Sequence, residues 1–138
     1  MKTLKNILAS ALLIILPAFS FAQTQQDILL SEEPGVMVTS EKMPEYPGGQ
    51  EAMMKFLSKN IQYPASALEN NKQGVVYVQF VVDIDGSITN TKVIRGFDAD
   101  CDAEALRVVN LMPNWTPGEQ DGKKVKVRFN LPIRFALN

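Results

Sequence analysis

The last part of the chain has the clearest alternation of apolar and polar positions. Apolar side chains occupy every second position, and mostly basic or amide side chains lie between them. The apolar positions are Val125, Val127, Phe129, Leu131, Ile133 and Phe135, and the polar positions include Lys124, Lys126, Arg128, Asn130 and Arg134. This pattern predicts a half-buried strand over residues 124–135 with a cationic outward face.

Pro132 lies on the outward face of this predicted strand. Because proline cannot donate a ladder hydrogen bond, it restricts the strand to a sheet edge, a bulge or a strand end. An edge strand leaves backbone donors and acceptors available to another chain. The cationic face would favour an acidic or carbonyl-rich partner segment, and a merely solvated surface is the alternative that the residues leave open.

Three segments have the spacing of amphipathic helices. Residues 50–60 place apolar side chains three and four positions apart, and a short second helix over 65–70 follows the break at Tyr63-Pro64. A third helix is expected over 102–112, with Asp100 or Asp102 available to cap its N–H groups. Its apolar side carries Ala105, Val108, Val109 and Met112, and its solvent-facing side carries Glu104, Arg107 and Asn110.

The remaining strands follow from apolar runs and turn signals. Residues 75–84 are apolar on both parities, which predicts a central strand. Asp85-Gly86 is a hairpin signal, and the irregular alternation of the returning strand over 87–95 predicts a bulge or an early end. A short strand is expected near Val36, whereas residues 114–124 are expected to form a loop anchored by Trp115. The order of elements predicts an α+β domain with its helices packed on one sheet face.

The first residues of the chain are typical of a targeting segment and not of a fold. Residues 1–22 combine an early positive charge, a short apolar run and small residues before Gln23, the pattern of a signal peptide. The apolar run is shorter than the roughly 20 residues of a membrane-spanning helix, and an uncleaved anchor remains the alternative. We expect residues 23–47 to be a flexible lead-in and residues 48–138 to be the domain.

Charge and residue usage exclude several classes of function. The chain has 14 basic and 15 acidic residues, and loss of Lys2 and Lys5 with the leader changes its net charge from −1 to −3. This balance predicts neither nucleic-acid binding nor strong attraction to anionic membranes. The chain contains no histidine, and its single cysteine, Cys101, allows no intramolecular disulfide. We expect Cys101 to be a small buried residue.

The sequence offers no catalytic or metal-binding motif. Asp98, Asp100 and Asp102 alternate as at the start of a calcium loop, but Ala103 and Val109 replace the glycine and glutamate that such a loop requires. No nucleophile elbow, zinc pair or phosphate-binding glycine loop is present. We therefore expect no enzymatic activity, no catalytic residues, no metal and no cofactor.

Several landmarks together resemble the TonB C-terminal domain family. They are Gln62-Tyr63-Pro64, the hairpin QGVVYVQFVVDIDGSI, the helix and turn ALRVVNLMPNWTPG, and the final strand KVKVRFNLPIRF. The resemblance covers Asn60 to Phe135, and the preceding EKMPEYPGG is similar to the lead-in of Bacteroidetes-type members. It implies a two-helix, three-stranded antiparallel domain in the periplasm.

The resemblance also implies a binding function. Members of this family bind a short peptide, the TonB box of outer-membrane TonB-dependent receptors, by adding it as a strand beside the last strand of the sheet. The implied contact regions are the segment before Pro64 and the last strand. Carried onto this sequence, the implied peptide-binding residues are Asn60, Gln62, Tyr63, Lys124, Lys126, Arg128 and Asn130.

The chain also departs from the energy-transducing members of the family. It lacks a histidine-bearing membrane anchor and a long proline-rich spacer. We therefore expect a periplasmic binding module, linked to transmembrane transport, that engages an outer-membrane receptor or another envelope protein. The alternatives are an energy transducer anchored in the inner membrane by residues 1–22, and a structural domain that forms a homodimer through its last strand.

Overall fold

The sheet is organised around β2 (Gly74–Val82), which lies between β3 (Ile88–Arg95) and β5 (Lys123–Phe135) and is antiparallel to both. This arrangement comes from a computed structural model that describes residues 35–137. The central position predicted for the apolar run is therefore confirmed. The predicted leader, residues 1–22, and most of the predicted lead-in lie outside the described residues.

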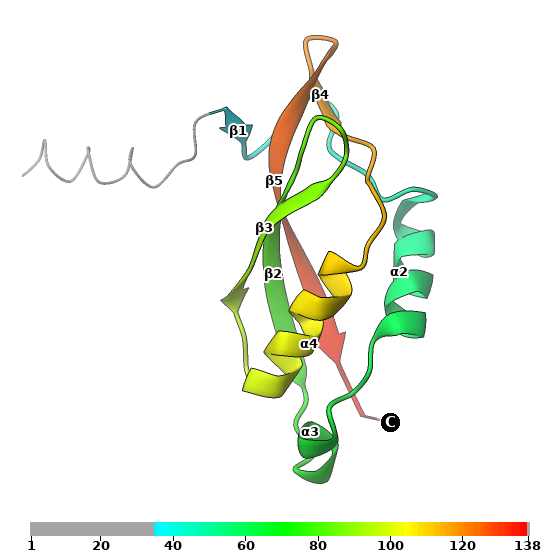
Figure 1. The fold of residues 1–138 in the computed structure, drawn as a ribbon, viewed down its shortest axis with the longest axis vertical. Helices are drawn as coiled ribbons and strands as arrows, with labels where there is room; N and C mark the ends of the chain where they lie inside the picture. Colours follow the sequence, from blue (N-terminus) through cyan, green and yellow to red (C-terminus); the bar gives the residue numbers. More distant parts are fainter. Residues whose placement is uncertain (1–34, 138) are drawn as a thin grey trace, which may run out of the picture. The chain divides into compact units, whose positions relative to one another are not determined.

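One face of the sheet forms the hydrophobic core. The paired positions of β2 and β5 on this face are Val76 and Ile133, Val78 and Leu131, Phe80 and Phe129, and Val82 and Val127. Except for the partly buried Phe129, these side chains are buried together with Met53 and Leu57 and with Ala105, Val108 and Val109. The latter two groups come from α2 (Gly49–Asn60) and α4 (Ala99–Asn110), the helices that pack against this face (Figure 1).

The helices confirm the predicted pattern, with one correction. α2, the short α3 (Ala65–Glu69) and α4 all form where the spacing predicts helices. However, α4 begins at Ala99, because the Asp98 side chain caps it by accepting a 3.1 Å hydrogen bond from the N–H of Cys101. The prediction that Asp100 or Asp102 caps this helix was wrong.

The sheet contains more strands than the resemblance implies. The described residues form three helices and a five-stranded sheet that includes β1 (Val36–Met37) and β4 (Gly118–Gln120). β1 pairs with β5 in parallel, so the sheet is mixed and the two-helix, three-stranded antiparallel description is incomplete. β4 lies in a segment predicted to be a loop, and the residues that join it to β5 are Asp121-Gly122, with φ of 53° and 73°. These are the left-handed angles of a tight hairpin turn.

The hairpin between β2 and β3 turns at the predicted place. The N–H of Gly86 donates to the carbonyl of Asp83 over 2.9 Å, and the Asp85 carboxylate accepts from the N–H and hydroxyl of Ser87. Those two hydrogen bonds hold the pKa of Asp85 below its ordinary value. Two register shifts between β2 and β3 confirm the predicted irregularity of the returning strand.

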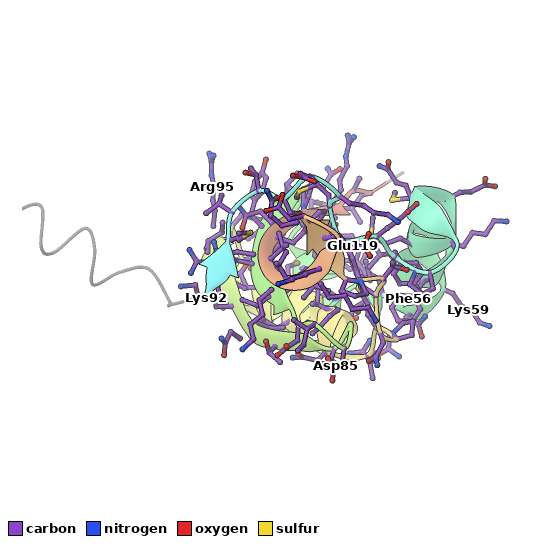
Figure 2. The ribbon with its side chains drawn as sticks, turned by 90° about the horizontal axis from the view of Figure 1, so that it is seen from above. Phe56, Lys59, Asp85, Lys92, Arg95 and Glu119 are labelled. Carbon is purple, nitrogen blue, oxygen red and sulfur yellow. The ribbon has the colours of Figure 1, made fainter. Side chains whose placement is uncertain are left out.

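The face of the sheet away from the helices carries polar and cationic side chains. Arg95 lies over the ring of Tyr77 at 5.9 Å, and Figure 2 shows Lys92 and Arg95 on the side of the molecule opposite α2. In the same view Phe56 points from α2 toward the sheet, whereas Lys59 points away from it. No helix within residues 35–137 has the length and apolar character needed to cross a bilayer.

Candidate functional site

The second edge of β5 is covered only at its beginning. Val127 pairs with Val82 of β2 on one side and with Met37 of β1 on the other. β4 pairs with Lys123, Lys124 and Val125, which precede the β5 residues that pair with β2. From Arg128 to Phe135, β2 is the only strand paired with β5 among the described residues. The predicted edge strand is therefore an edge over its second half and an inner strand at its start.

The position of Pro132 shows which residues direct backbone groups toward this open edge. Its missing N–H is tolerated where the strand does not bond to its neighbour β2. Beyond the strand, the N–H of Leu137 donates over 2.9 Å to the side chain of Gln73, the residue that precedes β2, so the odd positions face β2. The even positions therefore direct their backbone groups away from β2. Asn130 and Arg134 thus offer N–H and carbonyl groups to the open edge, which begins after the pairing of β1 with Lys126 and Val127.

A groove lies between the open edge of β5 and α2. It consists of two adjoining pockets of about 530 Å³ and about 260 Å³, which share Met54 and Pro132. We call this feature the edge groove. Its upper pocket is lined by residues that include Tyr46, Met53, Trp115 and Phe129, and its lower pocket by residues that include Leu57, Ile61, Tyr63, Ile133 and Phe135.

The wall of the upper pocket is fixed by the segment that precedes α2. Backbone hydrogen bonds of 2.8–3.0 Å join Lys42 to Glu119 and Glu45 to Thr116. These bonds place Tyr46 against Trp115, with ring centroids 5.9 Å apart in an edge-to-face arrangement. These contacts therefore fix the position of the groove wall relative to Trp115.

Trp115 forms the inner surface of the upper pocket. It is only 4% exposed, and its ring lies 5.3 Å from that of Phe80 and 5.2 Å from that of Phe129. The prediction that Trp115 anchors its loop in the core is confirmed. Its indole N–H is buried and has no hydrogen-bond partner within residues 35–137. A buried donor without a partner is uncommon, because its desolvation is uncompensated.

Two of the predicted binding residues line the edge groove. Asn130 lines the upper pocket, and its side-chain oxygen accepts a 3.1 Å hydrogen bond from Gln79. Tyr63 lines the lower pocket, where its ring packs edge-to-face on Phe135 and its hydroxyl donates to the carbonyl of Lys72.

The predicted basic residues of β5 lie on the outward face and outside both pockets. Lys124 pairs with Glu119 of β4, and Lys126 pairs with Val36 of β1, so the backbone at these positions has a strand neighbour. The Lys126 ammonium also lies 4.0 Å from Asp83. Arg128 is the predicted cation that lies where the open part of the edge begins, directly after the residues paired with β1.

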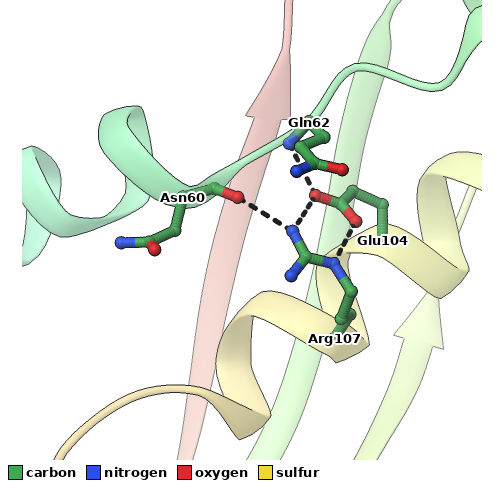
Figure 3. A network of polar contacts seen from close by, with 4 residues as sticks. All are labelled: Asn60, Gln62, Glu104 and Arg107. Carbon is green, nitrogen blue, oxygen red and sulfur yellow. Dashed lines mark hydrogen bonds and ion pairs between the residues drawn. The ribbon is translucent and has the colours of Figure 1, made fainter.

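The other two predicted residues, Asn60 and Gln62, belong to a polar network with α4 (Figure 3). The carboxylate of Glu104 accepts hydrogen bonds of 2.6 and 2.8 Å from Arg107 and of 2.6 Å from the N–H of Gln62. Arg107 also donates over 2.8 Å to the carbonyl of Asn60. These contacts fasten the end of α2 to α4 and use main-chain groups of Asn60 and Gln62.

Glu104 corrects the prediction that this side of α4 faces solvent. Its side chain is only 9% exposed, because the chain between α2 and α3 crosses over it. Hydrogen bonds from Arg107 hold the pKa of Glu104 below its ordinary value of 4.5. The ionised form of Glu104 is therefore more strongly favoured in the folded protein than in the unfolded chain.

Replacing Glu104 by glutamine is expected to lower the free energy of unfolding by about 1 to 2 kcal/mol at pH 7. Because the folded pKa lies below 4.5, the contribution of the carboxylate is complete above that pH and disappears as the pH falls through the folded pKa. Urea unfolding at pH 7, 4 and 3 should show the difference from the parent protein shrinking with pH. The control Glu51→Gln removes an exposed ion pair with Lys55 and should leave stability unchanged.

The residues that the sequence offers for chemistry have structural roles. Cys101 is buried as predicted, and burial raises the pKa of its thiol to about 11, which keeps it protonated. Asp98 caps α4, Asp100 accepts from the Ser66 hydroxyl, and Asp102 accepts from the N–H of Phe97. Within residues 35–137, no group of three or more potential metal ligands is close enough to hold a metal ion.

Comparison with known proteins identifies the domain. The model of the family described as Gram-negative bacterial TonB protein C-terminal matches residues 59–137. Two solution structures of the Helicobacter pylori TonB C-terminal domain, of residues 179–285 and 194–285 of that protein, are 24% identical to this chain. Each covers 62% of this chain, with 78% and 90% of its own length aligned and a TM-score of 0.48. No curated protein matches the chain. Because the family match covers more than half of the chain, the protein belongs to the TonB C-terminal domain family.

Proposed function

We propose that this domain is a non-enzymatic periplasmic module that binds an extended segment of an outer-membrane TonB-dependent transporter. The segment would add as a strand to β5 between Arg128 and Phe135. The observation that carries this proposal is the open edge of β5, where the backbone groups directed away from β2 have no strand partner after Arg128 within the described residues. Main-chain hydrogen bonds along such an edge supply the affinity of strand addition.

The charges beside the edge favour an acidic segment. Arg128 and Arg134 lie on the outward face of β5, and neither forms an ion pair with any residue from 35 to 137. Side chains of an added strand would alternate between this cationic face and the edge groove. The proposed partner is therefore a segment with acidic residues on one parity.

The charges along β5 favour a different partner segment over a second copy of this chain. An identical copy of β5 would bring Arg128 and Arg134 toward the same cations of its partner, which is unfavourable for directly opposed strands. The homodimer therefore becomes an outcome to be tested. An energy transducer that retains residues 1–22 as an anchor would use the same edge, and the intact mass of the native protein distinguishes this alternative.

The test is a titration of the isotope-labelled protein with synthetic peptides from the periplasmic ends of its host's TonB-dependent receptors. We expect shifts of backbone amide signals at Arg128, Asn130 and Arg134. N-methylation of the peptide on alternate residues should abolish binding on one parity and leave it nearly unchanged on the other, because only one parity bonds to β5.

Equal effects of N-methylation on both parities would contradict strand addition. Binding that leaves the amides of residues 128–135 unshifted would place the site elsewhere. If the molecular mass in solution rises from that of one chain to that of two as the protein concentration increases, and amide shifts are confined to residues 128–135, the homodimer would be favoured.

A further inference from the structure

We infer that the upper pocket of the edge groove is a specificity pocket for one aromatic side chain of the bound segment. This inference rests on the proposed function, because it names the chemistry of the partner at that same edge. The pocket of about 530 Å³ opens between β5 and α2, directly beside the unpaired backbone of Asn130. A side chain that points inward from an added strand would enter it.

The lining of the pocket matches an aromatic occupant. Tyr46, Trp115 and Phe129 present aromatic rings, and Met53 and Met54 present flexible thioethers. Edge-to-face ring contacts and sulfur–aromatic contacts both favour an aromatic side chain over an aliphatic one of similar area.

Met54 is the part of the pocket that a ligand would cover. It is 53% exposed, although the core-facing Met53 beside it is buried. It lines the same pocket as the buried Tyr46 and Trp115, so a ring that enters the pocket would contact it. Burial of Met54 by an incoming ring would add to the affinity.

The pocket wall comes from a segment that precedes the family match. The match begins at residue 59, whereas Tyr46 and Met54 lie before it, and Tyr46 directly follows the segment that the bridges join to Thr116 and Glu119. The cations Arg128 and Arg134 on the outward face of β5 would attract acidic side chains on the opposite face of the same bound segment. The geometry therefore points to a segment with an aromatic residue facing inward and acidic residues facing outward.

The experiment uses acetylated nine-residue peptides that carry glutamate on alternate positions and contain no tryptophan. One inward position is varied among Phe, Leu, Ala and Asp, and the dissociation constant is measured by calorimetry. We expect the Phe peptide to bind about 10- to 100-fold more tightly than the Ala peptide, from the area that a ring buries. Trp115 is the only tryptophan of the chain, so its emission should shift with the Phe peptide.

A pair of matched variants separates the pocket from general charge effects. Met54→Glu changes the mouth of the pocket, and Leu111→Glu makes the same change at a residue that is 52% exposed and lines neither pocket of the groove. Met54→Glu should weaken the Phe peptide about 10-fold more than the Ala peptide, whose charges are identical. Leu111→Glu should weaken neither.

The outcomes distinguish the inference from the proposed function. If all four peptides bind equally, shift the amides of residues 128–135 and leave Trp115 emission unchanged, the aromatic pocket is wrong and strand addition stands. If neither these peptides nor the receptor peptides bind, both the pocket and the proposed function are overturned. Preference for the Asp peptide would likewise overturn the pocket.

Discussion

Replacing Phe80 by alanine is expected to lower the free energy of unfolding by about 3 to 5 kcal/mol. Phe80 is fully buried on the central strand, and its ring lies 5.3 Å from that of Trp115 and 5.7 Å from that of Phe129. Its removal therefore leaves a cavity between β2 and the residues beneath the edge groove. Chemical denaturation followed by circular dichroism measures the loss.

The control for this substitution is Leu111→Ala. Leu111 is an exposed leucine, so its truncation should change stability by less than about 0.5 kcal/mol. Emission of Trp115 should also shift in the Phe80 variant, because one face of the indole loses its neighbour. Similar stability losses for the two variants would contradict the assignment of Phe80 to the core.

The periodic parts of the fold could be predicted from the sequence because burial imposes the period. Val76, Val78 and Phe80 are buried at alternate positions of β2, and the apolar positions of β5 pair with them across the sheet. The same reasoning predicts α2 and α4, whose buried residues recur at helical spacing. A hydrophobic pattern identifies which side of an element is covered.

The same pattern does not show what covers each side. Glu104 has the spacing of a solvent-facing helix residue, but the chain that follows α2 crosses over it and donates the N–H of Gln62. β1 is only two residues long and β4 only three, too short for any periodicity to be visible. The dipeptide Asp121-Gly122 could have predicted the hairpin of β4 and β5, since the same type of dipeptide, Asp85-Gly86, predicts the hairpin of β2 and β3.

The candidate site also has a part that could be predicted from the sequence and a part that could not. The open edge of β5 could be predicted from Pro132 and the alternation of the strand, and the structure retains Asn130 and Tyr63 in the edge groove. Tyr46 and Met54 could not be predicted as site residues, because their approach to β5 depends on how α2 and the segment before it pack on distant parts of the chain. Contacts between segments that are distant in the sequence leave no local pattern.

Replacing Gly86 by alanine is expected to lower the free energy of unfolding by about 2 to 4 kcal/mol. Gly86 has a φ of +88°, and a Cβ atom there would lie 2.0 Å from the carbonyl oxygen of Trp115. Relief of this contact requires a backbone shift, because the N–H of Trp115 donates over 2.7 Å to the carbonyl of Gly86. The variant should therefore disturb Trp115 and weaken the aromatic peptide as well.

Gly122→Ala is the matched control, since Gly122 has a φ of +73° but a Cβ atom there would meet no other atom within 4 Å. It should show only the strain of a left-handed alanine, about 1 to 2 kcal/mol, with no change in Trp115 emission. Because both variants carry that strain, the difference between them measures the contact of the β2–β3 hairpin with Trp115. Equal losses would mean that the hairpin does not hold the wall of the pocket, and the position of Trp115 would then depend on its contacts with Tyr46, Phe80 and Phe129.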